Sequence, residues 1–87
     1  MSVYIDNFNA QYSRMKMCHM IADTTEELLA MADKIGVARK WIQKAGTYHE
    51  HFDVCQSKKA LALSFGAKEI TASQLGMMLV ARRKQIT

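Results

Sequence analysis

Alternating polar and apolar side chains at the start of the chain predict two β-strands. Residues 2–6 form a short β-branched and aromatic run that ends in Asp6-Asn7, which is typical of a strand entering a turn. Within residues 14–23, two sets of side chains alternate and so lie on opposite faces of an extended chain. One set is Met15, Met17, His19 and Ile21, and the other is Lys16, Cys18, Met20 and Ala22. The polar segment between the two strands, residues 7–13, is expected to be a loop.

A helical repeat of apolar positions follows the second strand. Thr24 and Glu27 have the spacing of a capping box, in which side chains satisfy the amide donors of the first helical turn. Apolar residues then recur at helical spacing as far as Ile35, and Gly36 supplies a left-handed stop. This segment therefore predicts an amphipathic helix between Thr24 and Gly36.

The middle of the chain predicts a turn and a second helix. Residues 37–43 are expected to form a turn or irregular helix, with the single tryptophan, Trp41, packed at the edge of the core. A helix over residues 56–65 is expected to turn Leu61 and Phe65 inward and to end at the following glycine.

The last part of the chain predicts a brief strand over residues 67–70 and a final helix. Thr71 and Gln74 form a second capping box, and basic residues at the other end of the helix suit its dipole. The side chains expected to face inward are Leu75, Met78 and Leu79. The order of elements predicts a single α/β domain over residues 1–87, with a short, mostly parallel or mixed sheet packed by about three helices.

Composition and charge narrow the classes of protein. The chain is 49% hydrophobic and 23% charged, which is typical of a globular domain. Its net charge of +4 is mild, and its basic residues are scattered apart from residues 82–84, whereas duplex-binding proteins concentrate them. Cys18 and Cys55 lack the spacing of a zinc knuckle or a disulfide framework. Without an apolar run of about 20 residues or a signal peptide, we expect a cytoplasmic protein, monomeric or a small homo-oligomer, with no membrane partner.

The stretch TYHEHFDV, residues 47–54, places His49, His51 and Asp53 at alternate positions. In an extended strand such residues point the same way and lie about 6.6 Å apart, so two imidazoles can reach one ion. Asp53 could add a carboxylate ligand or fix a histidine tautomer. We therefore expect His49, His51 and Asp53 as metal ligands. Asp6 is expected to join them, because it closes the first strand and ligands gather at the carboxyl ends of strands in α/β sheets. The alternative left open is that His49 is an exposed loop residue while His51 and Asp53 bond to backbone amides, with Asp53 capping the next helix.

Several of these residues also carry a family resemblance. The pieces VYID, MCHMIADTTEELLAMADKIG, HFDV and GAKEITASQL resemble a family of small phage and bacterial proteins, domain of unknown function 4031, over nearly the whole chain. The family pattern falls here on Asp6, His19, Asp23, His51 and Asp53. Cys55 stands where several bacterial relatives have proline, and a Gly-Leu-Pro after the first helix is missing. The resemblance implies a phage or prophage origin and assigns no activity.

Convergence of these residues would create a site for a phosphate-containing ligand. Carboxylates and imidazoles fit a divalent metal ion that activates water, with a histidine moving protons near neutral pH. Lys16, Arg14 and Lys58 would offset the phosphate charge. The side chains expected to be catalytic are His19, Asp23, His51 and Asp53. The predicted activity is that of a metal-dependent phosphoesterase or nuclease.

Other interpretations stay open at this point. Without a metal the same residues could act as a general acid and base. A non-enzymatic alternative is a phage accessory protein that binds a host protein or sequesters a nucleotide, because exposed methionines suit adaptable surfaces. The polar residues could also have structural roles, with Asp23 as a helix cap, Asp6 in an Asx turn and His19 as a satisfied, partly buried side chain.

Overall fold

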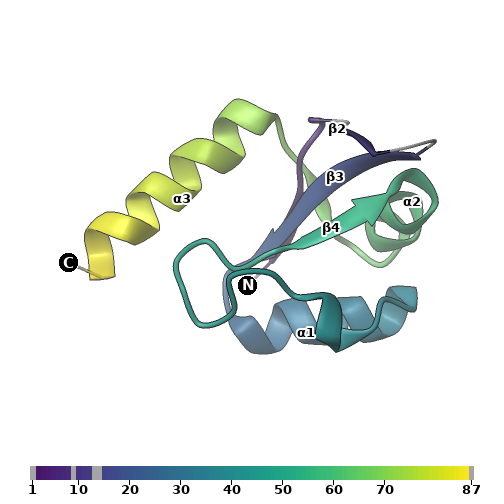
Figure 1. Ribbon diagram of the computed structural model, residues 1–87, viewed down its shortest axis with the longest axis horizontal. Helices are drawn as coiled ribbons and strands as arrows, with labels where there is room; N and C mark the ends of the chain where they lie inside the picture. Colours follow the sequence, from purple (N-terminus) through teal and green to yellow (C-terminus); the bar gives the residue numbers. More distant parts are fainter. Residues whose placement is uncertain (1, 9, 13–14, 87) are drawn as a thin grey trace.

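The computed structural model describes residues 2–8, 10–12 and 15–86, and the side chains of residues 2–8 and 16–84 (Figure 1). The elements in chain order are β1 (Val3–Ile5), β2 (Ala10–Tyr12), β3 (Met15–Ala22), α1 (Thr25–Ile35), a short 3₁₀ helix η1 (Arg39–Trp41), β4 (Phe52–Cys55), α2 (Gln56–Ser64), β5 (Lys68–Glu69) and α3 (Ala72–Ile86). The predicted α/β domain with a mixed sheet and three α-helices is confirmed. The expectation of a loop over residues 7–13 is wrong in part, because β2 forms there by pairing with β3.

The sheet is built around β3, which is its longest strand. Strand β4 pairs with one side of β3, and β1 and β2 pair with its other side, all antiparallel. Strand β5 then adds to β1 in parallel. Strands β3 and β4 are antiparallel although α1 lies between them, against the parallel pairing expected across a helix. The long segment after α1 turns the chain once more, so that it enters β4 near the end of β3 (Figure 1).

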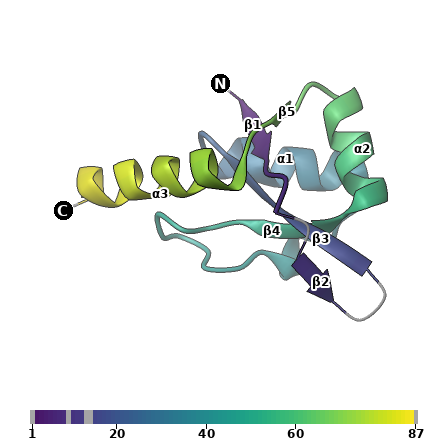
Figure 2. The same ribbon diagram turned by 90° about the horizontal axis from the view of Figure 1, so that it is seen from above.

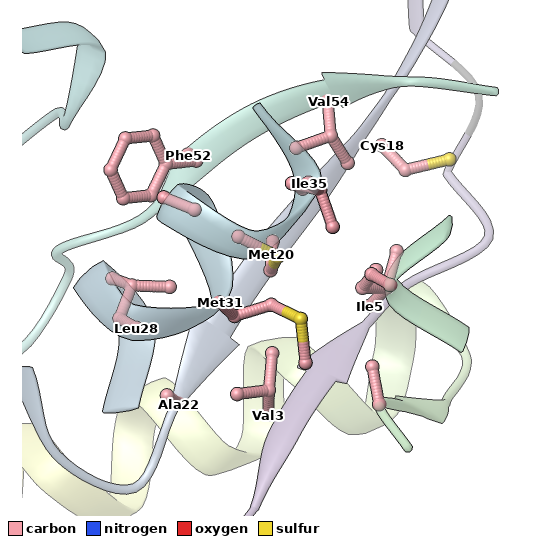
Figure 3. Close-up of a cluster of buried hydrophobic side chains, with 13 residues drawn as sticks. Val3, Ile5, Cys18, Met20, Ala22, Leu28, Met31, Ile35, Phe52 and Val54 are labelled. Atoms are coloured by element: carbon pink, nitrogen blue, oxygen red, sulfur yellow. The ribbon is translucent and has the colours of Figure 1, made fainter. Parts of the chain in front are cut away.

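Two apolar clusters lie on the two faces of this sheet. Cys18, Met20 and Ala22 of β3 point toward α1 and α2, and they join the main core with Val3, Ile5, Phe52 and Val54 (Figure 3). The helix side of this core contains Leu28, Met31, Ala32 and Ile35 of α1 and Ala62 of α2. The opposite face of β3 presents Ile21 to Leu75 and Leu79 of α3. The alternation read from the sequence is therefore confirmed over residues 16–22, with one face buried more fully than the other.

Both predicted capping boxes are present. The Thr24 hydroxyl accepts a hydrogen bond from the Glu27 amide at 3.2 Å, and α1 ends at Gly36 with a left-handed φ of 78°. At α3 the box is reciprocal, because Gln74 N donates to Thr71 Oγ1 at 3.0 Å and Thr71 N donates to Gln74 Oε1 at 2.8 Å. Local side-chain chemistry thus determines where both helices begin.

Two predictions of burial are wrong. Leu61 and Phe65 are exposed, and α2 buries Lys59 and Ala62 instead. The small Ala62 lets α2 approach the core closely, and the Lys59 ammonium group reaches Glu69 at 2.6 Å while its apolar stem is covered. Trp41 is 63% exposed rather than packed at the core edge. Its ring centroid lies 5.2 Å from the Lys40 ammonium group. This cation–π contact takes the place of part of the expected packing against the core.

Helix α3 extends away from the sheet, with its C-terminus far from the strands (Figure 2). Leu75 and Leu79 are buried and Met78 is half-buried, as the sequence predicts, whereas Met77 and Val80 on the outer side are exposed. None of the helices in the described part of the chain combines the length and apolar character needed to cross a bilayer.

Candidate metal centre

His19 lies on the face of β3 that α3 leaves partly open. It is directly opposite Asp53 in the antiparallel pairing of β3 with β4. On the other side of β3, Asp6 follows the last residue of β1, and its amide donates to the His19 carbonyl at 3.1 Å. One face of the sheet thus carries a row of three side chains from neighbouring segments, namely Asp6, His19 and Asp53.

A change of register fixes the position of the Asp6 carboxylate. Ile5 pairs with Met20 and Ala10 pairs with Met17, so the register against β3 slips by two residues between Ile5 and Ala10. Such a bulge re-aims the side chains near it. Asp6 Oδ1 accepts hydrogen bonds from the amides of His19 at 2.9 Å and Phe8 at 3.3 Å, and Oδ2 lies 2.8 Å from His19 Nδ1. The buried carboxylate therefore fixes both the strand and the imidazole.

His51 and Asp53 occupy alternate positions at the start of β4 and share the face of His19. His51 Nδ1 lies 2.8 Å from the carbonyl oxygen of His49. The opposite nitrogen, Nε2, lies 3.6 Å from Asp53 Oδ1. His19 Nε2 approaches the same carboxylate oxygen to 4.0 Å. The second oxygen, Asp53 Oδ2, accepts a hydrogen bond from Gln43 Nε2 at 2.7 Å.

These partners determine which nitrogen of each histidine carries its proton. A carbonyl oxygen only accepts, so His51 Nδ1 is the donor to His49, and His19 Nδ1 donates to the Asp6 carboxylate in the same way. In the neutral rings, both Nε2 atoms then carry a lone pair and lie within 4.0 Å of Asp53 Oδ1. Two lone pairs and a carboxylate oxygen repel one another unless a cation or a proton lies between them. The arrangement is therefore suited to a positively charged ligand.

The same three side chains come close to the spacing of a metal site. One ligand atom each from His19, His51 and Asp53 lies within 4.8 Å of the other two. Ligand atoms of a tetrahedral zinc ion are roughly 3.4 Å apart, as bonds of about 2.1 Å imply, so small side-chain rotations would close this cluster on an ion. Each ligand already has an outer hydrogen bond, as in known metal centres. The side chain of His51 is 10% exposed and that of His19 is 32% exposed, which leaves one side open to solvent.

Comparison with known proteins places the chain in a family. The family model described as protein of unknown function (DUF4031) matches residues 3–82. The chain belongs to the DUF4031 family. No curated protein and no solved structure matches it. Of the five polar positions that carried the resemblance, four converge in this DUF4031 protein, namely Asp6, His19, His51 and Asp53.

Asp23 does not join the cluster of this DUF4031 protein, contrary to the expected convergence. It lies just beyond β3, where its carboxylate accepts a hydrogen bond from the Ser2 amide at 2.8 Å. It lines a separate cleft of about 350 Å³ beside the first turn of α1 and Arg82. Four residues of extended strand, about 13 Å, separate it from His19. The alternative role of helix cap belongs to Thr24.

His49 and Asp6 lie around the three-residue cluster of the DUF4031 protein rather than within it. His49 is exposed in a turn, and its ring stacks on Tyr48 at 5.9 Å between centroids. Partial burial lowers the pKa of His49, and the charges of His51, Lys44 and His19 lower it further. Asp6 acts through His19, as an outer hydrogen-bond acceptor. Gln43 has the same kind of role for Asp53, and its sequence context gave no signal of this.

The cations predicted to bind phosphate are dispersed in the DUF4031 protein. Lys16 alternates with Cys18 and Met20, so it points to the opposite face from His19. The Lys58 ammonium group lies beside Gly36, where it suits the C-terminal end of the α1 dipole. Arg14 lies outside the described residues. Lys44 is the cation whose charge acts on His49, and it was not among the predicted residues.

Proposed function

We propose that this DUF4031 protein binds a divalent metal ion through His19, His51 and Asp53 and hydrolyses phosphate esters with it. The observation that supports this most is the convergence of two anchored histidines on one carboxylate oxygen, with Nε2 to Oδ1 distances of 4.0 and 3.6 Å. A purely structural role would not require both Nε2 atoms to face an acceptor. A metal ion would stabilise all three groups at once.

The ligand set indicates the kind of ion. Two imidazole nitrogens and one carboxylate oxygen suit zinc, manganese or iron, and they suit magnesium less well because it prefers oxygen ligands. Catalytic zinc sites commonly have three protein ligands and an open position for water or substrate. The solvent-exposed edge of His19 is compatible with such a position.

The chemistry follows from the properties of the bound ion and of the residues around it. A divalent ion lowers the pKa of bound water and polarises a phosphoryl oxygen. The outer contacts from Asp6 to His19 and from Gln43 to Asp53 would keep the ligands in place throughout turnover. The net charge of +4 favours an anionic substrate over a cationic one. A phosphate ester is anionic and also has a phosphoryl oxygen that the metal ion can polarise.

Metal titration with matched histidine variants tests the first part of this proposal. Zn²⁺, Mn²⁺ and Mg²⁺ are titrated into the metal-stripped protein by calorimetry, and the melting temperature is recorded in parallel. Zn²⁺ or Mn²⁺ should bind saturably and raise the wild-type melting temperature. His51→Ala should lose this binding, whereas His49→Ala should keep it, because His49 lies outside the cluster and contributes only its carbonyl oxygen. Asp6→Asn should weaken binding about 10- to 100-fold through the loss of its outer contact.

Hydrolysis tests the second part. The metal-loaded protein is incubated with p-nitrophenyl phosphate and bis-p-nitrophenyl phosphate, and release of nitrophenol is followed. Turnover that requires the metal and disappears in His51→Ala supports the phosphoesterase assignment. Equal metal binding by wild type and His51→Ala would contradict the site, and metal binding without turnover on either ester or on nucleic acid would contradict the activity.

A second candidate function is supported by the outer side of α3. Gly76, Met77, Val80 and Ala81 form an apolar strip on this side, and Met77 and Val80 are exposed. Such a surface is typical of a binding module that associates with another protein. Absence of metal binding in the titration would favour this candidate over the phosphoesterase.

A further inference from the structure

We infer that the phosphate ester is a nucleotide, whose base stacks on Phe8 while its phosphate reaches the metal cluster. This inference rests on the proposed function, because it names the substrate of the same site. It starts from an aromatic side chain that neither the core nor the proposed metal chemistry uses.

Phe8 is placed beside the cluster although it is not part of the core. It is 56% exposed, so most of its ring is available to a ligand. Its ring centroid lies 5.5 Å from that of His19, with 49° between the ring planes. His19 in turn lies 5.5 Å from the His51 ring. Phe8 therefore stands one side chain away from the metal-ligating atoms, at the exposed edge of the site.

The position of Phe8 is coupled to that of His19 by one carboxylate. Asp6 Oδ1 accepts the Phe8 amide at 3.3 Å and the His19 amide at 2.9 Å, while Oδ2 holds the His19 ring. Asp6 is almost completely buried. Its carboxylate therefore holds Phe8 and His19 from beneath the protein surface. The aromatic ring and the metal ligand are thus set relative to each other by the same group.

The chemistry of the pair selects among phosphate esters. A flat aromatic face stacks on any nucleobase, and the base of a nucleotide is separated from its phosphate by one sugar. A sugar phosphate offers no aromatic face to Phe8. A phospholipid would require a wide apolar surface rather than one ring beside polar groups. A nucleotide uses both features of the site at once.

Binding measurements with and without the base test the inference. Mn²⁺-loaded protein is titrated with AMP and with ribose 5-phosphate at low temperature to suppress turnover, using wild type, Phe8→Ala and Phe8→Tyr. Base stacking is worth about 1–3 kcal/mol, or roughly 5- to 160-fold in affinity. Wild type should therefore bind AMP more tightly than ribose 5-phosphate by such a factor. The preference should disappear in Phe8→Ala and persist in Phe8→Tyr. An adenosine octamer titrated in parallel distinguishes a free nucleotide from a strand by which of the two binds more tightly.

The outcomes separate this inference from the proposed function. Equal affinities for AMP and ribose 5-phosphate in Mn²⁺-loaded wild type would overturn the nucleotide inference and leave the metal site standing. A base preference unchanged in Phe8→Ala would also overturn it, provided that this variant still binds Mn²⁺. Failure of wild type to bind Mn²⁺, Zn²⁺ or Mg²⁺ would overturn the metal-dependent function, and the inference with it.

Discussion

Asp6 shows how much of the candidate site depends on a single buried group. A buried carboxylate is costly unless its oxygens accept hydrogen bonds, and Asp6 accepts two amide hydrogen bonds and lies against the His19 imidazole. These contacts offset the cost of burial and at the same time fix the tautomer of His19. The same carboxylate therefore stabilises the end of β1 and orients the His19 ring in the candidate site.

Cys55 supplies a prediction at the residue scale. A hydrogen bond with the Ser57 hydroxyl, at 3.2 Å, and contacts with the amides that begin α2 lower the pKa of the Cys55 thiol. The thiolate therefore forms at lower pH than for an ordinary cysteine. The rate of its reaction with iodoacetamide should rise with pH, and the midpoint, the pH at which half of the maximal rate is reached, should be lower than for an ordinary cysteine. Cys18 is buried and should stay unmodified. Mass spectrometry of the metal-free protein measures both rates.

Ser57→Ala is the matched variant for this thiol. Loss of the hydroxyl removes the largest cause of the shift, so the midpoint for Cys55 should move upward toward its ordinary value. A midpoint that stays the same in the variant would show that Ser57 does not control the thiol.

At this scale the sequence predicted the positions of the candidate ligands better than those of their hydrogen-bond partners. Alternation along residues 51–53 correctly put His51 and Asp53 on one face, because side-chain direction in a strand is local. The contact of His19 with Asp6 depends on strand register across 13 residues, which no local pattern encodes. Asp23 was grouped with His19 through the family pattern, yet an extended strand carries them apart.

At the scale of elements, α3 is positioned mainly by the contacts at its first turn. The reciprocal box of Thr71 and Gln74 satisfies its free amides, and the Ala72 amide donates to Asn7 Oδ1 at 3.0 Å. Asn7 directly follows Asp6, so the start of α3 is tied to the same end of β1 that holds His19. The cap thus links the helix to the edge of the candidate site.

Loss of this cap gives a prediction for the element. Thr71→Ala should lower the free energy of unfolding by about 1 kcal/mol, because the Gln74 amide loses its acceptor. Urea denaturation measures the change. Ser73→Ala is the control, since Ser73 is exposed in the same turn and is not the cap. Equal losses in the two variants would mean that the cap contributes nothing specific.

Elements were predictable where local side-chain chemistry defines their ends. They were less predictable where pairing with another strand defines them. Capping residues and Gly36 correctly marked the limits of α1 and the start of α3. Strand β2 lies in a polar segment and exists through its pairing with β3, so its composition gave no sign of it. The inward face of α2 was misjudged because hydrophobicity favoured Leu61, whereas the close packing of the helix favours Ala62.

At the scale of the whole molecule, the sheet is covered unequally. Helices α1 and α2 bury one face with the main core, whereas α3 covers only the part of the other face around Ile21 (Figure 2). The part that α3 leaves open carries His19, His51 and Asp53. The projection of α3 also makes the molecule elongated, with extents of 37 × 23 × 22 Å. The open face and the weakly attached helix follow from the same arrangement.

This arrangement predicts that α3 unfolds locally while the candidate metal cluster of His19, His51 and Asp53 stays formed. Beyond its first turn, α3 is held by the packing of Leu75, Met78 and Leu79 and by the hydrogen bond that Arg82 donates to the Ala22 carbonyl. This attachment is smaller than the main core, so α3 should open at lower free energy. By hydrogen exchange with mass spectrometry, peptides from residues 75–84 should exchange faster than peptides from α1. Leu79→Ala should accelerate exchange in α3 alone.

Metal binding should affect hydrogen exchange differently in the two parts of the molecule, the strands that carry the candidate cluster and α3. Asp6, His19, His51 and Asp53 come from strands and segments that adjoin the main core and not from α3. A bound metal ion should therefore slow exchange in β3 and β4, because it stabilises only states in which the cluster is formed, and it should leave α3 nearly unchanged. Equal protection of α3 and β3 by the metal would contradict this, because it would show that α3 opens only when the whole domain unfolds.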